Sequence, residues 1–160
     1  MGDMFCFQCQ ETAKNTGCTM GGVCGKKADT ANAQDFLIWV TKGLSQAAVL
    51  ARKEGKKVSK DVNHIVTVNL FTTITNANFD TAAIHARTAL TIQEKAKILA
   101  SLSSKDGLSE AALWSSLDEK EWEVKSKTIG VLSTQHEDIR SLRELITIGL
   151  KGLSAYSKHA

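Results

Sequence analysis

The segment MFCFQCQETAKNTGCTMGGVCGK, residues 4–26, contains all four cysteines of the 160-residue chain. Their spacing is Cys6-x2-Cys9-x8-Cys18-x5-Cys24. Four thiolates this close in sequence repel one another unless a metal shares their charge, and a metal also deprotonates its thiol ligands. We therefore predict that the four cysteines bind a metal centre and that residues 4–28 form a loop around it.

The spacing favours an iron–sulfur cluster, with [4Fe–4S] as the first choice. A cubane cluster needs four thiolate ligands, and the longer x8 and x5 intervals can bring two of them from the far side. Zinc sites built from four cysteines usually combine two short C-x2–4-C pairs, whereas only Cys6 and Cys9 form such a pair here. Spacing alone leaves a [2Fe–2S] cluster, zinc and disulfides as alternatives.

Residues around the cysteines are suited to a charged cluster. Glycines allow tight turns whose backbone amides point at the sulfurs, lysines can offset negative charge, and apolar side chains can exclude water. The glycines are Gly17, Gly21, Gly22 and Gly25. The lysines are Lys14, Lys26 and Lys27, and the apolar residues are Phe5, Phe7 and Met20.

From residue 29 onward the sequence predicts an all-α domain of five to six helices in antiparallel bundles. The clearest helix spans 31–52, with Asp29 or Thr30 as its N-cap and one apolar face. A helix over 60–75 has a β-strand as a local rival because many of its residues are β-branched. The other expected helices cover 80–101 (with a possible break near Thr91), 109–116, 118–127 and the stretch from 137 to the end.

Composition and charge exclude several classes of protein. The net charge is +3, and no basic run is interleaved with aromatic residues, so we expect no nucleic-acid partner. No apolar stretch reaches the roughly 18 residues of a membrane span, and the N-terminus does not look like a signal peptide, so we expect no membrane partner and a cytoplasmic location. Thiols in the cytoplasm stay reduced, which favours metal over disulfides.

The remaining reactive side chains form no catalytic pattern. The four histidines are scattered along the chain, and surface or interhelical packing is the expected role for each of them. The serines and histidines lack a spacing that supports a hydrolytic triad. The histidines are His64, His85, His136 and His159.

The cysteine segment closely resembles the start of the hybrid cluster proteins, also called prismane proteins or hydroxylamine reductases. The resemblance rests on Phe5 to Thr12, on Gly17-Cys18-Thr19 and on Cys24-Gly25-Lys26. It continues in the turn 73–78 and in the segments 130–145 and 149–152, so it covers nearly the whole chain. Met4 looks like the family's first residue, which makes residues 1–3 an expected extension or tag remnant.

The resemblance implies that Cys6, Cys9, Cys18 and Cys24 hold the proximal cubane cluster of this family. It further implies an electron-transfer domain, 4–160, that takes electrons from a donor protein and passes them to a catalytic hybrid cluster in later domains. The family's reaction is the reduction of hydroxylamine to ammonia, and nitric oxide reduction is also associated with it. The chain has no cysteine after Cys24, so we expect these residues alone to lack the catalytic centre and the later domains.

Two further expectations follow. The alternative function is a structural or assembly module in which the cluster, or a four-cysteine zinc, staples the N-terminal loop to the helices. We also expect apolar residues of the last helix to be exposed where absent domains would pack, which would favour a homo-oligomer.

Overall fold

The structure is a computed structural model that describes residues 3–159. Within this range it contains six α-helices, two short 3-10 helices and no β-strand, which confirms the all-α prediction. Met1 and Gly2 of the expected extension lie outside the described residues. The helices are α1 (Ala28–Lys53), α2 (Lys60–Thr72), α3 (Thr81–Ser101), α4 (Glu110–Leu113), α5 (Glu119–Ile129) and α6 (Glu137–His159), with 3-10 turns at Ala13–Asn15 and Val131–Ser133.

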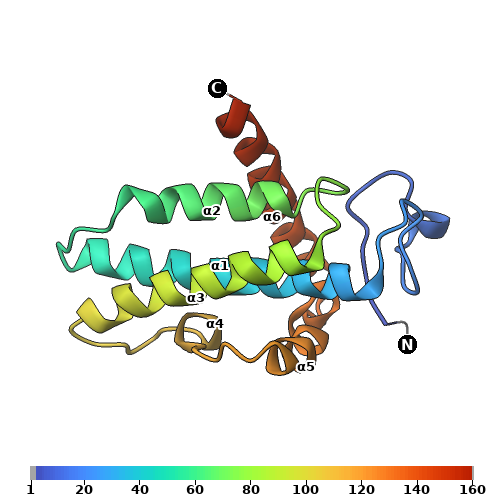
Figure 1. Ribbon diagram of the computed structural model, residues 1–160. Helices are drawn as coiled ribbons and strands as arrows, with labels where there is room; N and C mark the ends of the chain where they lie inside the picture. The colour runs from blue at the N-terminus through green and yellow to red at the C-terminus, as the bar shows by residue number, and fades with distance from the viewer. Residues whose placement is uncertain (1–2, 160) are drawn as a thin grey trace.

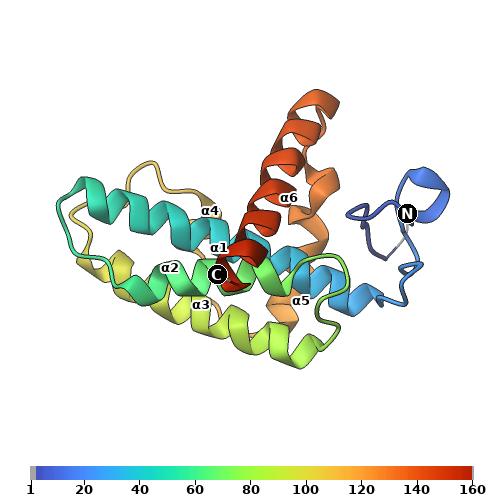
Figure 2. The same cartoon turned by 90° about the horizontal axis from the view of Figure 1, so that it is seen from above.

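Helix α1 is the central element of the domain. Helices α1, α2 and α3 lie side by side and alternate in direction, and α4 and α5 also pack against α1 (Figure 1). Helix α6 packs mainly on α2 and crosses the bundle steeply (Figure 2). The cysteine segment lies beyond the N-terminal end of α1, beside the turn between α2 and α3. None of the helices in residues 3–159 is both long and apolar enough to cross a lipid bilayer.

The apolar face predicted for α1 forms the core. Every residue of the expected stripe is at most 2% exposed, and the buried side chains of α2, α3 and α5 complete two core clusters around it. The predicted N-cap is wrong, since α1 begins at Ala28 and the Asp29 carboxylate accepts a hydrogen bond from the Thr30 N–H inside the first turn. The stripe consists of Phe36, Leu37, Val40, Leu44, Ala47, Ala48 and Ala51.

Helix α3 runs without interruption through Thr91, where a break seemed possible. The Thr91 hydroxyl donates to the Arg87 carbonyl at 2.7 Å and accepts from the Asn69 amide at 2.8 Å. The same amide group of Asn69 donates to the Thr41 hydroxyl at 2.9 Å, so a buried polar cluster joins α1, α2 and α3. Thr91 therefore serves interhelical packing and does not cap a new helix.

Helix α1 lies very close to α4 at Gly43. A Cβ atom placed there would overlap the backbone carbonyl of Ala111 in α4. Since α4 is fixed from the other side by the buried Lys95, whose Nζ donates to the same carbonyl, its backbone has little room to move. Glycine is required at this position by packing and not by its backbone dihedral angles.

We predict that Gly43→Ala lowers the free energy of unfolding by about 2 kcal/mol, because the added methyl group overpacks the α1–α4 contact. Gly152→Ala on α6 is the matched control, since its Cβ would meet no atom within 4 Å. That variant should gain up to about 1 kcal/mol from helix propensity. Urea unfolding of both variants checks the prediction, and equal stabilities would contradict it.

Asp35 is an acidic residue that is half-buried in the domain. It lies on α1 and faces the connection between α5 and α6, where a Cβ on Gly130 would lie 2.9 Å from its Oδ2. Loss of hydration raises the pKa of Asp35 to about 7, and nearby lysines oppose the shift only in part. The charged groups that act on it are Lys151, Glu144, Lys26 and Lys42.

We predict that Asp35→Asn makes the stability of the protein less sensitive to pH. A carboxyl whose pKa is raised on folding favours the folded state below its unfolded pKa and loses that stability as pH rises through the folded value. Wild type and variant should therefore match near pH 4, and the variant should be more stable by about 2 kcal/mol at pH 8. Denaturant unfolding at both pH values tests this, and a difference independent of pH would contradict it.

Candidate functional site

The cysteine segment folds back on itself so that two predicted ligands face each other. Cys6 and Cys18 form an antiparallel bridge, in which each N–H donates to the other's carbonyl at 3.0 and 2.8 Å. Gly17, just before Cys18, has a φ of 142°, and a Cβ there would overlap the ring of Phe5. The close return of the chain therefore needs glycine at position 17.

The sulfur of Cys18 lies in a polar pocket made by its own segment. The residue is 5% exposed, and its Sγ accepts a hydrogen bond from the Ala13 N–H at 3.4 Å and lies 3.7 Å from the Thr12 hydroxyl. The N–H groups of Ala13 and Val23 lower the pKa of the Cys18 thiol, against the opposing effect of burial. The backbone thus favours the thiolate, which is the form that binds metal.

The other three cysteines are more accessible. Cys6 and Cys9 are half-buried, and Cys24 is exposed. A Cβ on Gly22 would lie 3.0 Å from the Cys24 Sγ, so the small residue at position 22 leaves space beside that sulfur. All four cysteines lie within the described range, and none of them forms a disulfide in this structure.

The four thiols share one segment without meeting at one point. Among residues 3–159, no three side chains of His, Cys, Asp or Glu gather closely enough to hold a single metal ion. The donors still fit an iron–sulfur cluster in their chemistry, because cysteine thiolates are the ligands of such clusters and N–H donors to sulfur stabilise them. The observed amide contact to the Cys18 Sγ is of this kind.

The residues expected to surround the cysteines take different positions. Met20 was expected to exclude water, and this is wrong, since its side chain is 87% exposed. Phe5 and Phe7 are half-buried and pack against each other with ring centres 5.4 Å apart. Lys14 and Lys27 are exposed, as is Met20, because the segment bulges away from the helices.

Lys26 is buried behind the segment. Its Nζ donates to the Gln34 Oε1 at 2.7 Å, and its charge contributes to the lowered pKa of Cys18. The Gln34 amide in turn donates to the Asn78 carbonyl at 3.0 Å, which links the segment to the turn before α3. This lysine therefore lies near the Cys18 sulfur, while its role in offsetting the charge of a cluster stays a prediction.

Two contributors to the site are not marked by the cysteine spacing or by the residues next to the cysteines. Gln8 lies between the first two cysteines, and its side-chain oxygen accepts hydrogen bonds from Lys151 of α6 and from the Thr75 N–H. A contact across 143 positions of the chain cannot be found from local patterns. The only available signal is the position of Lys151 on the polar side of an otherwise strongly amphipathic helix.

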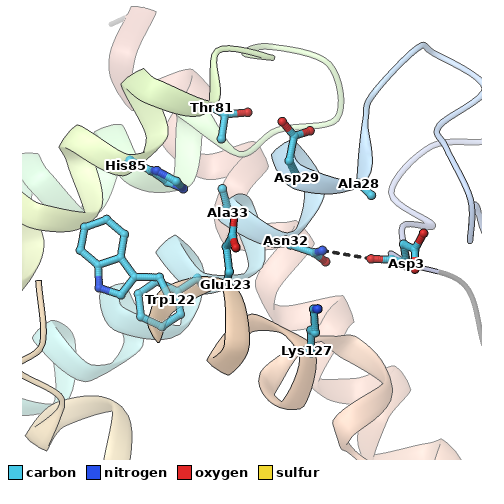
Figure 3. Close-up of a pocket in the computed structure, with 11 residues that line it drawn as sticks. Asp3, Ala28, Asp29, Asn32, Ala33, Thr81, His85, Trp122, Glu123 and Lys127 are labelled. Carbon is cyan, nitrogen blue, oxygen red and sulfur yellow. Dashed lines mark hydrogen bonds between the residues drawn. The ribbon is translucent and has the colours of Figure 1, made fainter. Parts of the chain in front are cut away.

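A separate cavity of about 350 Å³ opens at the start of α1 (Figure 3). His85 and Trp122 line one side, and Asn32 lies on the other, with its amide donating to the Asp3 carbonyl at 3.0 Å. His85 stands edge-on to the Trp122 ring and forms a 3.0 Å contact with Glu119. The expected packing role is therefore confirmed for His85, and no cysteine lines this cavity.

Comparison with known proteins agrees with these observations. A hydroxylamine reductase from Desulfovibrio desulfuricans is 54% identical over 157 residues, which cover 98% of this chain and 29% of the relative. Proteins of the same name from Clostridium perfringens and Nitratidesulfovibrio vulgaris are 50% and 45% identical and are each covered to 30% of their length, again over 98% of this chain. The chain thus spans less than a third of these relatives.

A family model described as the Prismane/CO dehydrogenase family matches residues 4–160. The match includes the four cysteines, the helical bundle and α6, and it begins at Met4, which was expected to be the first residue of the family segment. With relatives about 50% identical over nearly its whole length, the chain belongs to the Prismane/CO dehydrogenase family.

Proposed function

We propose that this chain is the iron–sulfur electron-transfer domain of a hydroxylamine reductase. It would receive electrons from a donor protein in the cytoplasm and relay them to a catalytic hybrid cluster held by residues outside this chain. The reaction of the complete protein would be the reduction of hydroxylamine to ammonia, with nitric oxide as a further possible substrate. The four-cysteine segment, in which the Ala13 N–H donates to the Cys18 Sγ, is the observation that carries this proposal.

The proposed ligands are Cys6, Cys9, Cys18 and Cys24, and [4Fe–4S] is the proposed cluster. When bound, such a cluster supplies one-electron transfer. The chain's own residues would stabilise its charge, since the Ala13 N–H points at the Cys18 Sγ and the Lys26 ammonium lies behind the segment. The exposed edge at Cys24 gives an external donor access to the segment.

The structural alternative is that a cluster or zinc ion staples the N-terminal segment to the helices. It draws support from the contacts that the segment already makes with the bundle through Gln8 and Lys26. The two functions differ in their redox behaviour. A relay changes its oxidation state reversibly, whereas a zinc staple is colourless and keeps one oxidation state.

We predict about four iron and four sulfide ions per chain after anaerobic purification, with a broad visible absorption that bleaches reversibly on reduction. Cys18→Ser should lose most of the iron and the absorption, because it removes the most buried ligand. Met20→Ser is the matched control, since it changes an exposed side chain of the same segment. Metal analysis and visible spectroscopy provide the measurement.

Three outcomes of that experiment count against the electron-transfer proposal. One zinc ion per chain would favour the staple, and so would an iron–sulfur cluster that cannot be reduced reversibly. Equal iron content in wild type and Cys18→Ser would remove Cys18 from the ligand set. The helical content of each variant should be compared by circular dichroism, so that unfolding is not mistaken for ligand loss.

The outer face of α6 is apolar and exposed, as expected from the sequence. Leu145 is 69% exposed, and the residues that bury themselves against the bundle are the polar Thr147, Lys151 and Ser154. We infer that this face packs against other domains in a full-length reductase and that a second copy covers it in the isolated chain. The exposed apolar residues of α6 are Ile139, Leu142, Leu145, Ile146, Ile148, Leu150, Leu153 and Tyr156.

We predict that the 160-residue chain self-associates at high concentration and that Leu145→Gln with Leu153→Gln makes it monomeric. Both side chains are more than 60% exposed, so the substitutions should leave the stability of the monomer nearly unchanged. Val124→Gln on α5 is the control, because it removes an exposed apolar side chain from a different helix. Sedimentation at several concentrations tests this, and a wild-type chain that stays monomeric contradicts it.

A further inference from the structure

A buried hydrogen-bond node joins the cysteine segment to two distant parts of the chain. The Gln8 Oε1 accepts from the Lys151 Nζ at 3.0 Å and from the Thr75 N–H at 3.3 Å. The Lys151 Nζ also donates to the Thr73 carbonyl at 3.0 Å. One lysine of α6 therefore binds both the Cys6–Cys9 stretch and the turn that follows α2.

Lys151 is unusually buried for a lysine, at 4% exposed. Burial of an ammonium group is unfavourable unless hydrogen bonds and opposite charge compensate it. Burial lowers the pKa of Lys151 to about 8, while Asp35 and Glu144 oppose that shift and Lys26 adds to it. The side chain is thus cationic at neutral pH, and its charge lies close to the predicted ligands.

Lys151 is a charged residue on the buried side of α6, which it shares with Thr147 and Ser154. Its neighbours Leu150 and Leu153 point to solvent, whereas Lys151 points into the bundle. A surface lysine would gain more hydration and more rotamer freedom on the outer face, so packing of α6 alone does not call for a lysine here. The acceptors on Gln8 and Thr73 supply the reason for its inward position.

We propose that Lys151 is a positioning residue for the iron–sulfur site. Lys151 holds the Cys6–Cys9 stretch through Gln8 and presents a positive charge to the ligand segment. Its charge favours the more negative, reduced state of a redox group bound by these thiolates, so Lys151 raises the reduction potential. The part that concerns the potential rests on the proposed electron-transfer function. The positioning of the Cys6–Cys9 stretch does not rest on that function, because the hydrogen bonds through Gln8 exist in the polypeptide itself.

The first test uses the metal-free 160-residue chain and hydrogen exchange. The N–H groups of Cys6 and Cys18 each donate to the carbonyl of the other residue. In Lys151→Met both N–H groups should exchange at least about tenfold faster. That rate ratio corresponds to about 1.4 kcal/mol. Lys158→Met is the matched control, since it removes an exposed lysine from the same helix. Core amides of α1 serve as the reference for global stability, and unchanged exchange at both cysteines would overturn the proposal.

A double-mutant cycle guards against a general effect on folding. If Lys151 acts through Gln8, then Gln8→Leu combined with Lys151→Met should speed exchange no more than either change alone. Additive effects would show that the two side chains act separately and would overturn the positioning role. Lys151→Arg keeps the charge and the donors, so it should restore slow exchange at least in part.

The second test measures the reduction potential of the iron–sulfur-loaded chain at pH 6.5, where Lys151 is cationic. Lys151→Gln should shift the potential to more negative values, and Lys151→Arg should return it toward wild type. An unchanged reduction potential in Lys151→Gln would overturn the charge role, since the loss of a merely structural residue would leave the potential unchanged. If the wild-type chain binds no cluster, the proposed function fails, while the exchange experiment still decides the positioning role.

Discussion

Burial of one apolar face of α1 is the interaction on which the rest of the domain depends. That face supplies both core clusters, and α3, α4 and α5 all pack on the same helix. Its close contact with α4 requires a residue without a side chain, which is Gly43. Because the cysteine segment is attached directly to the start of α1, the packing of this helix also fixes where the segment lies.

The polar interior then connects the bundle to the candidate site. Lys26 and Lys151 are both buried, and each donates to a glutamine that also contacts a loop near α2 and α3. Two ammonium groups in this place would be costly in a purely structural domain, since a buried charge needs compensation. Under the proposed function, the negative charge of a cluster bound by four thiolates would offset both of them.

Prediction of the site from sequence worked where the evidence was local. The need for glycine at position 17 and the place of Lys26 near the Cys18 sulfur could be read from spacing and neighbours, whereas the role of the four cysteines as ligands stays a prediction. Met20 was misplaced because nothing in the sequence tells whether a loop residue turns toward the bundle or to solvent. Gln8 and Lys151 were missed because their contact joins positions 143 residues apart, and the roles of both depend on it.

The sequence by itself determined the helices and the family and marked four cysteines as candidate ligands, since each depends on periodicity, spacing or residue type over short stretches. Tertiary structure decided how the cysteines are supported. It paired Cys6 with Cys18, directed the Ala13 N–H to sulfur and turned Lys151 inward. These features depend on which surfaces meet when distant segments pack, and that choice is made by the free energy of the whole fold.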